Sequence, residues 1–230
     1  MRKHLRTLLA CVIAMLTLGT VAACSGGSTT ATSPTPSSSA AAVKDFPKSA
    51  HYIADMPMAD GKTMTIGVAV EGDKIAAYAC DGIKDEAWFF GTQKDGSLDI
   101  TSKYQDTLKA SFNGTAVVGQ LNMNDVNYTF TAASVPSPSG MYTVAANGVR
   151  ASWVVRPDNT ITGVQFKISK ESDTSDLVQA KDQKFRDQVR QRRQSRLLQP
   201  APPLELVTWR STVNGVPVTA ILVNGDTRLS

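Results

Sequence analysis

Apolar and polar residues alternate with a period of two over most of the chain beyond residue 60. Val126, Tyr128, Phe130 and Ala132 are separated by Asn and Thr residues, and segment 162–168 shows the same alternation. Such alternation places one face of a β-strand on a core and the other face in water. The pattern therefore predicts a mainly β fold.

Turn sequences separate the alternating segments at short intervals. They are Gly72-Asp73, Asp81-Gly82, Asp95-Gly96, Asn113-Gly114, Asn147-Gly148 and Pro157-Asp158-Asn159. Asn-Gly and Asp-Gly pairs tolerate the positive φ angles that tight hairpins require. The predicted strands are 64–70, 75–80, 87–92, 97–101, 107–112, 115–121, 126–132, 141–146, 149–156 and 160–168. Because nearly every connection is short, we expect an antiparallel meander of eight to ten strands, closed into a barrel or folded into a sandwich.

The strand pattern ends near residue 170, and a basic helix is predicted to follow. Ser172–Ser175 is typical of residues that cap a helix, and Asp176 suits its first turn. Strand alternation is absent from there to Pro200, which cannot continue a helix. We therefore expect one helix at about 176–198.

Residues 43–230 are predicted to form a single, mostly β domain. They number 188, enough for a real hydrophobic core. At the end of this domain, two further strands at 204–210 and 216–223 flank the turn pair Asn214-Gly215. They predict a final β-hairpin, which either returns to the sheet or makes a separate small subdomain.

The N-terminus carries a different pattern. Three basic residues, Arg2, Lys3 and Arg6, precede the apolar stretch Leu8–Leu18. A basic head, a short apolar core and small residues before a break are typical of a secretory signal peptide. A helix of this apolar stretch would be roughly 16 Å long, well short of the ~30 Å hydrocarbon core of a bilayer. A lasting transmembrane helix is therefore the weaker interpretation.

The segment Val21-Ala22-Ala23-Cys24 resembles the lipobox of bacterial lipoproteins. The resemblance implies that residues 1–23 are removed and that a diacylglyceryl group on Cys24 anchors the protein at the extracytoplasmic face of the cell membrane. Two acyl chains bind a bilayer firmly where one chain binds weakly. The alternative is an ordinary secreted protein with a chance cysteine near its cleavage site. The remainder of the chain resembles uncharacterised envelope lipoproteins of high-GC Gram-positive bacteria, which implies no particular chemistry.

Residues 24–42 are expected to be the lipidated cysteine followed by a disordered linker. Segment 25–42 contains only Ser, Thr, Gly, Pro and Ala, which cannot bury enough surface to offset the entropy of ordering. Loss of Arg2, Lys3 and Arg6 takes the chain from a net charge of +4 to 21 basic residues against 20 acidic ones. A nearly neutral mature chain argues against nucleic acid as a partner.

Candidate catalytic residues are few. Asp81, Asp85 and Glu86 cluster at one turn, and paired carboxylates can act as general acid and base in a hydrolase. A solvated turn is the simpler interpretation. The alternating Asp/Asn pattern of a calcium loop is missing, and two His and three Cys are too few for a His-rich metal site, so we expect neither metal nor cofactor. We expect His51 at the surface and Cys80 buried and inert, although a lone thiol in the envelope could also react.

Six aromatic residues lie at strand positions consistent with one inner face of the sheet. They are Tyr78, Trp88, Phe90, Tyr128, Phe130 and Trp153. They either fill a solid core or line a barrel cavity, since an eight-stranded barrel can enclose one small molecule. The second interpretation predicts a carrier of a hydrophobic molecule or lipid.

The predicted helix carries a run of basic residues. These are Lys184, Arg186, Arg190, Arg192, Arg193 and Arg196. A tethered cationic helix could contact anionic lipid head groups or a wall polymer, although a solvated helix is the simpler interpretation. Aromatic residues do not alternate with the arginines, which argues against single-stranded nucleic acid. Together the patterns predict a lipid-anchored, non-enzymatic binding module whose ligand and protein partner the sequence does not identify, with a hydrophobic carrier and a hydrolase as alternatives.

Overall fold

The computed structural model of the protein describes residues 42–168, 183–194, 196 and 198–229. The predictions for the signal peptide, for Cys24 and for the linker up to residue 41 lie outside the described residues. The same holds for the first part of the predicted helix, residues 176–182.

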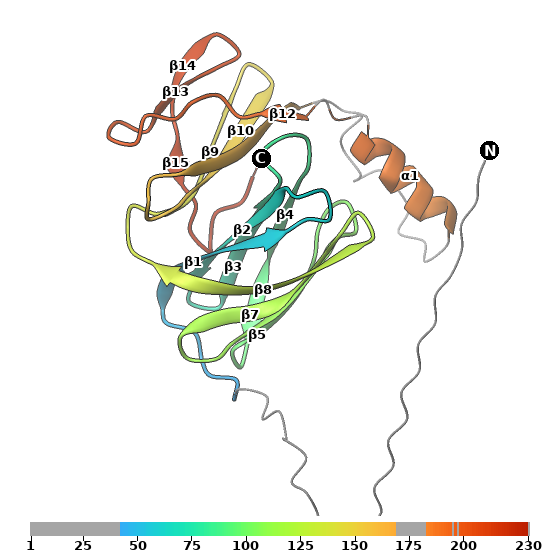
Figure 1. The fold of residues 1–230 in the computed structure, drawn as a ribbon, viewed down its shortest axis with the longest axis vertical. Coiled ribbons are helices and arrows are strands. Elements are labelled where there is room, and N and C mark those ends of the chain that lie inside the picture. Colours follow the sequence, from blue (N-terminus) through green and yellow to red (C-terminus); the bar gives the residue numbers. More distant parts are fainter. Residues whose placement is uncertain (1–41, 169–182, 195, 197, 230) are drawn as a thin grey trace, which may run out of the picture. The chain divides into compact units, whose positions relative to one another are not determined.

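Eight antiparallel strands form a closed barrel (Figure 1). They are β1 (Ser49–Pro57), β2 (Thr63–Glu71), β3 (Lys74–Cys80), β4 (Glu86–Lys94), β5 (Ser97–Thr101), β6 (Thr107–Phe112), β7 (Ala116–Met123) and β8 (Val126–Val135). Each strand pairs with the next in sequence, and β1 closes the barrel by pairing with β8 at His51↔Val135 and Ile53↔Ala133. The predicted meander is confirmed, and it closes into a barrel rather than a sandwich.

Alternate residues of the eight strands fill the barrel interior. Ile66, Phe89, Leu108 and Leu121 are completely buried there. The interior core draws on every strand of the barrel. The tight connections rely on residues that accept positive φ angles, as at Asp95 (φ 50°) and Gly96 (φ 72°).

A second sheet has the strand order β12-β11-β10-β9-β15. Its strands are β9 (Gly140–Ala146), β10 (Val149–Val155), β11 (Ile161–Lys167), β12 (Leu198–Pro200) and β15 (Ile221–Leu222). Met141, Val154 and Val164 of this sheet form a core cluster with Ala76 and Tyr78 of the barrel. The outer face of β3 is therefore buried as well, because the second sheet covers it.

The predicted final β-hairpin is confirmed, but the predicted bounds of its first strand, 204–210, are wrong. Segment 204–210 is not a strand, because the backbone turns at Trp209 (φ 55°) and the Trp209 amide donates to the Glu205 carbonyl. The hairpin around Asn214-Gly215 consists instead of β13 (Arg210–Val213) and β14 (Val216–Thr219), which form a two-stranded sheet. The chain then returns to the second sheet through β15.

The described helix is α1 (Gln183–Gln194). It ends earlier than predicted, because the Arg196 amide donates to the Arg193 carbonyl and Leu198 already belongs to β12. Within the described ranges, no helix has the length and apolar character needed to span a bilayer. The described residues belong to one compact unit.

The sequence prediction missed two strands, β1 and β12. In β1, Tyr52, Ala54 and Met56 face the barrel interior while Ile53 belongs to the cluster between the barrel and the second sheet. Ile53 therefore interrupts the alternation of buried Tyr52 and Met56 with the more exposed His51 and Asp55, which obscures the period of two.

Candidate functional site: the charged cluster at the barrel mouth

One end of the barrel gathers charged and polar side chains. Consecutive strands are antiparallel, so every second connection lies at the same end. We call the end formed by residues 58–62, 81–85, 102–106 and 124–125 the barrel mouth.

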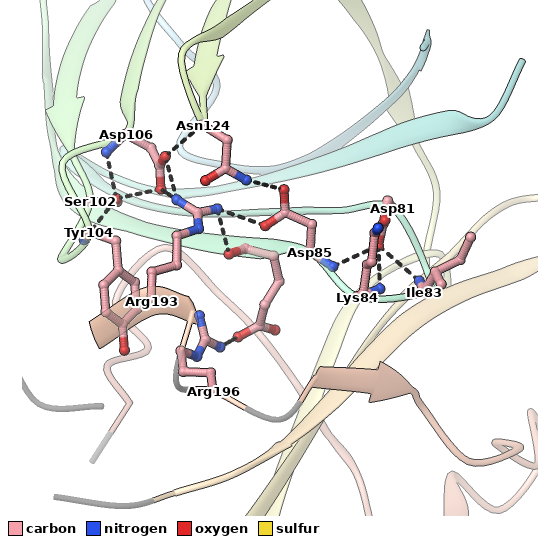
Figure 2. Close-up of polar contacts among 11 residues, drawn as sticks. Asp81, Ile83, Lys84, Asp85, Ser102, Tyr104, Asp106, Asn124, Arg193 and Arg196 are labelled. Carbon is pink, nitrogen blue, oxygen red and sulfur yellow. Dashed lines mark hydrogen bonds and ion pairs between the residues drawn. The ribbon is translucent and has the colours of Figure 1, made fainter. Parts of the chain in front are cut away.

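Asp81 shapes the β3–β4 connection. Its Oδ1 accepts hydrogen bonds of 2.8 Å from the backbone amides of Ile83, Lys84 and Asp85 (Figure 2). A carboxylate that accepts several backbone amides locks the turn around it. Asp81 thereby holds the backbone of Asp85 in place.

Asp106 is fixed by the neighbouring connections. Ser102 Oγ donates to Asp106 Oδ2 at 3.0 Å and accepts the Asp106 amide at 3.0 Å. The backbone amide of Asn124 donates to Asp106 Oδ1 at 3.2 Å. The Asp106 carboxylate is thus buried and oriented by contacts from two separate barrel connections.

Arg193 of α1 inserts its guanidinium group between these acids (Figure 2). Nη1 donates to both carboxylate oxygens of Asp106 at 2.5 Å. Nη2 donates to Asp85 Oδ1 at 2.8 Å and to the Glu86 carbonyl at 3.2 Å. The planar guanidinium suits this arrangement, since it presents several donors in a rigid fork.

Arg196 makes a second buried ion pair, with Glu86. Its guanidinium carbon lies 4.1 Å from the ring centroid of Phe166 and 5.0 Å from that of Tyr104. Ring faces attract cations, more strongly where water is excluded. The side chains of Arg196 and Glu86 are 3% and 1% exposed, so this pair is essentially dry.

Burial is the main influence on the pKa values of Asp85 and Glu86. Burial raises the pKa of Asp85, although the nearby Arg193 guanidinium opposes the shift. Burial also raises the pKa of Glu86 against the influence of Arg196. Burial disfavours the charge on Arg193, yet the carboxylates of Asp106 and Asp85 outweigh it and raise the pKa of Arg193. Removing one member of such a cluster would leave a buried charge without its partner.

The three acids proposed for a hydrolase do not converge on a common point. Asp81 is taken up by backbone amides, Asp85 contacts Arg193 and Asn124, and Glu86 contacts Arg196. Sequence reasoning missed Ser102, Asp106 and Asn124, which complete the cluster. The sequence offered only one hint of their role: all three are polar residues in connections between neighbouring predicted strands.

The prediction that Arg193 and Arg196 contact an anionic surface is wrong. Both are buried, because Asp85 and Asp106 bind Arg193 and Glu86 binds Arg196. Lys184 is exposed and Arg192 is half-buried. The side chains of Arg186 and Arg190 lie outside the description.

The predicted single face of aromatic residues is also wrong. Tyr128 and Phe130 belong to the barrel interior, whereas Tyr78, Trp88 and Phe90 lie on the outer face that meets the second sheet. Trp153 packs on the far side of that sheet, with Tyr142 and Leu204. In β3 and β4 the interior positions are instead Ala77, Ala79, Ala87 and Phe89. The six residues therefore cannot line one barrel cavity.

Cys80 and His51 are both shielded from solvent to some degree. Cys80 is buried, as expected, and burial raises the pKa of its thiol to about 12. His51 is half-buried rather than at the surface, and burial lowers the pKa of its imidazole against the influence of Glu71. The described part of the chain contains no group of three or more His, Cys, Asp or Glu residues that could hold a metal ion.

A hollow of about 390 Å³ adjoins the cluster. It is lined by Lys84, Asp85, Asn124, Asp125, Arg193, Arg196 and Leu198. Comparisons of this chain with protein-family models, with curated proteins and with solved structures give no match. The geometry of the charged cluster is therefore the main structural guide to function.

Proposed function

We propose that this protein is a lipoprotein anchored through Cys24 at the extracytoplasmic face of the cell membrane, where its β domain acts as a non-enzymatic binding module. The observation that carries the proposal is the lipobox-like segment Val21-Ala22-Ala23-Cys24 behind a basic and apolar leader. A diacylglyceryl group would supply the two acyl chains that firm attachment requires.

The position at which the N-terminal segment joins the barrel supports this proposal. The Lys44 amide donates to the Phe112 carbonyl at 2.8 Å, and the Lys44 carbonyl lies against Gly96. Gly96 and Phe112 belong to the barrel end opposite the mouth, since they adjoin the β4–β5 and β6–β7 connections. A tether at that end leaves the charged cluster at the other end of the barrel.

The contacts of the acids favour binding over hydrolysis. General acid–base chemistry needs a carboxyl group within hydrogen-bond reach of a substrate. Asp81, Asp85 and Glu86 are each engaged by partners within the protein. Asp85 instead acts together with Asp106 to bind a cation, and the guanidinium group of Arg193 is that cation in this structure.

Replacement of Cys24 tests the anchor. The wild-type protein is expected in the membrane fraction, with a diacylglyceryl mass on its first mature residue. Cys24→Ala should leave the membrane fraction. Cys80→Ala is the matched control, because it removes the buried thiol and should not change the location. Membrane association of Cys24→Ala at the wild-type level would contradict the proposal.

A further inference from the structure

The acids of the barrel mouth are held in place without help from α1. Ser102 and the Asn124 amide orient Asp106, and Asp81 fixes the backbone amide of Asp85. All of these contacts come from barrel connections. A site of this kind keeps its geometry when α1 is absent, and a preorganised site binds its ligand at a lower entropic cost.

Helix α1 reaches the mouth with one face. Phe185, Val189 and Arg193 are spaced four residues apart, and all three are buried. This spacing places them on one side of the helix. Arg196 follows beyond the end of α1 and is buried as well. The segment that docks on the barrel therefore carries two buried arginines, Arg193 and Arg196, separated by two residues.

The second ion pair, between Glu86 and Arg196, leaves polar atoms without partners next to the mouth. Glu86 Oε2 and Arg196 Nε are buried and have no hydrogen-bond partner among the residues that the structure describes. A buried polar atom without a partner is costly, and a ligand or an ordered water that satisfies it gains that energy back. A hollow lined by Asp85, Arg193 and Arg196, among others, adjoins the two arginines.

We propose that the barrel mouth is a binding site for the guanidinium group of an arginine-bearing peptide, and that Arg193 fills this site within the same chain. The site consists of Asp85, Asp106 and the Glu86 carbonyl, with Glu86 as the neighbouring acid for a second arginine. The inference rests on the proposed function as a binding module and names the ligand class.

The chemistry selects arginine over lysine. The guanidinium group donates to Asp106 through one nitrogen and to Asp85 through another, at 2.5 Å and 2.8 Å. An ammonium group is a single point charge and cannot reproduce this fork. Because the buried acids need a cation, Arg193 can leave the site only when another guanidinium group replaces it. A partner must therefore compete with Arg193, whose effective concentration at the site is high because it belongs to the same chain.

A labelled peptide with the sequence of residues 183–198 tests the site on the full chain. We expect the Arg193→Ala/Arg196→Ala chain to bind this peptide about tenfold or more tightly than the wild-type chain does. Adding Asp106→Asn to that chain should abolish the gain. A peptide with lysine at both arginine positions should bind about tenfold more weakly than the arginine peptide.

A second receptor guards against misfolding of the alanine variant. Arg193→Lys/Arg196→Lys keeps both positive charges, so the buried acids stay compensated, and it should also bind the arginine peptide more tightly than the wild-type chain. Circular dichroism verifies the β fold of each receptor. The proposal is overturned if both folded receptors bind the peptide no better than the wild-type chain, if binding survives Asp106→Asn, or if the lysine peptide binds equally well. Failure of the anchor would be seen separately, in the membrane fractionation of Cys24→Ala.

Discussion

Asp85 and Glu86 are neighbours in sequence, yet they hold two different arginines, Arg193 and Arg196. Successive side chains at the start of β4 point in opposite directions. The Asp85 side chain therefore meets the guanidinium at the barrel mouth, while the Glu86 side chain enters the interface between the barrel and the second sheet. Two adjacent acids thus join the segment after β11 to the barrel at two separate points.

Asp106→Asn is expected to loosen α1 without unfolding the barrel. The substitution removes one of the carboxylates that hold Arg193, and the loss of a hydrogen bond to a charged group costs about 1.5–3 kcal/mol. Trypsin should cleave α1 faster in this variant, because the helix contains several basic residues. Asp99→Asn is the matched control, since Asp99 is 64% exposed and pairs with the exposed Lys109. Equal cleavage rates for the wild type and Asp106→Asn would argue that the ion pair does not hold the helix.

The contribution of His51 to stability is expected to fall as the pH drops below about 6.5. Burial lowers the pKa of His51 from its ordinary value of 6.5. In the window between the folded and the unfolded pKa, the unfolded chain binds more protons, so protonation favours unfolding. The stabilisation is therefore present above pH 6.5 and is lost as the pH falls through the folded pKa.

Denaturant unfolding measured at several pH values checks this role of His51. His51→Gln, which is neutral throughout, should flatten the profile near pH 6.5. The pKa of Asp55 is lowered by its hydrogen bonds to Arg156 and Thr65 despite burial, so its contribution is lost only as the pH falls below about 3.8, outside the His51 window. An unchanged slope near pH 6.5 in His51→Gln would show that another group is responsible.

Two glycines with similar φ angles allow the cost of backbone strain to be distinguished from the cost of steric crowding. Gly61 (φ 78°) and Gly96 (φ 72°) both adopt a conformation that costs an L-residue about 1 kcal/mol. A Cβ on Gly61 would meet nothing within 4 Å, whereas a Cβ on Gly96 would lie 2.0 Å from the Lys44 carbonyl oxygen. Gly96→Ala should therefore lower the melting temperature clearly more than Gly61→Ala does. Equal losses would mean that the segment around Lys44 moves away at little cost.

The strand pattern and its turns could be predicted from local sequence, and so could the antiparallel meander in outline, but not the choice between a barrel and a sandwich. The β4–β5 hairpin depends on Asp95 and Gly96, whose preference for positive φ is a property of the residues themselves. In contrast, β1 was missed because the buried Ile53 interrupts its alternation, and the burial of Ile53 follows only from the second sheet lying against the barrel.

The candidate site divides in the same way. The sequence by itself determined the alternating strands, the basic segment around Arg193 and the lipobox-like Cys24, because periodicity and short motifs are local properties. Only the tertiary structure decided that Arg193 is buried between Asp85 and Asp106, which lie about a hundred residues away along the chain. The barrel brings the β3–β4 and β5–β6 connections to one end, where their carboxylates need a cation. Arg193, which was expected at the surface, supplies that cation and is therefore buried.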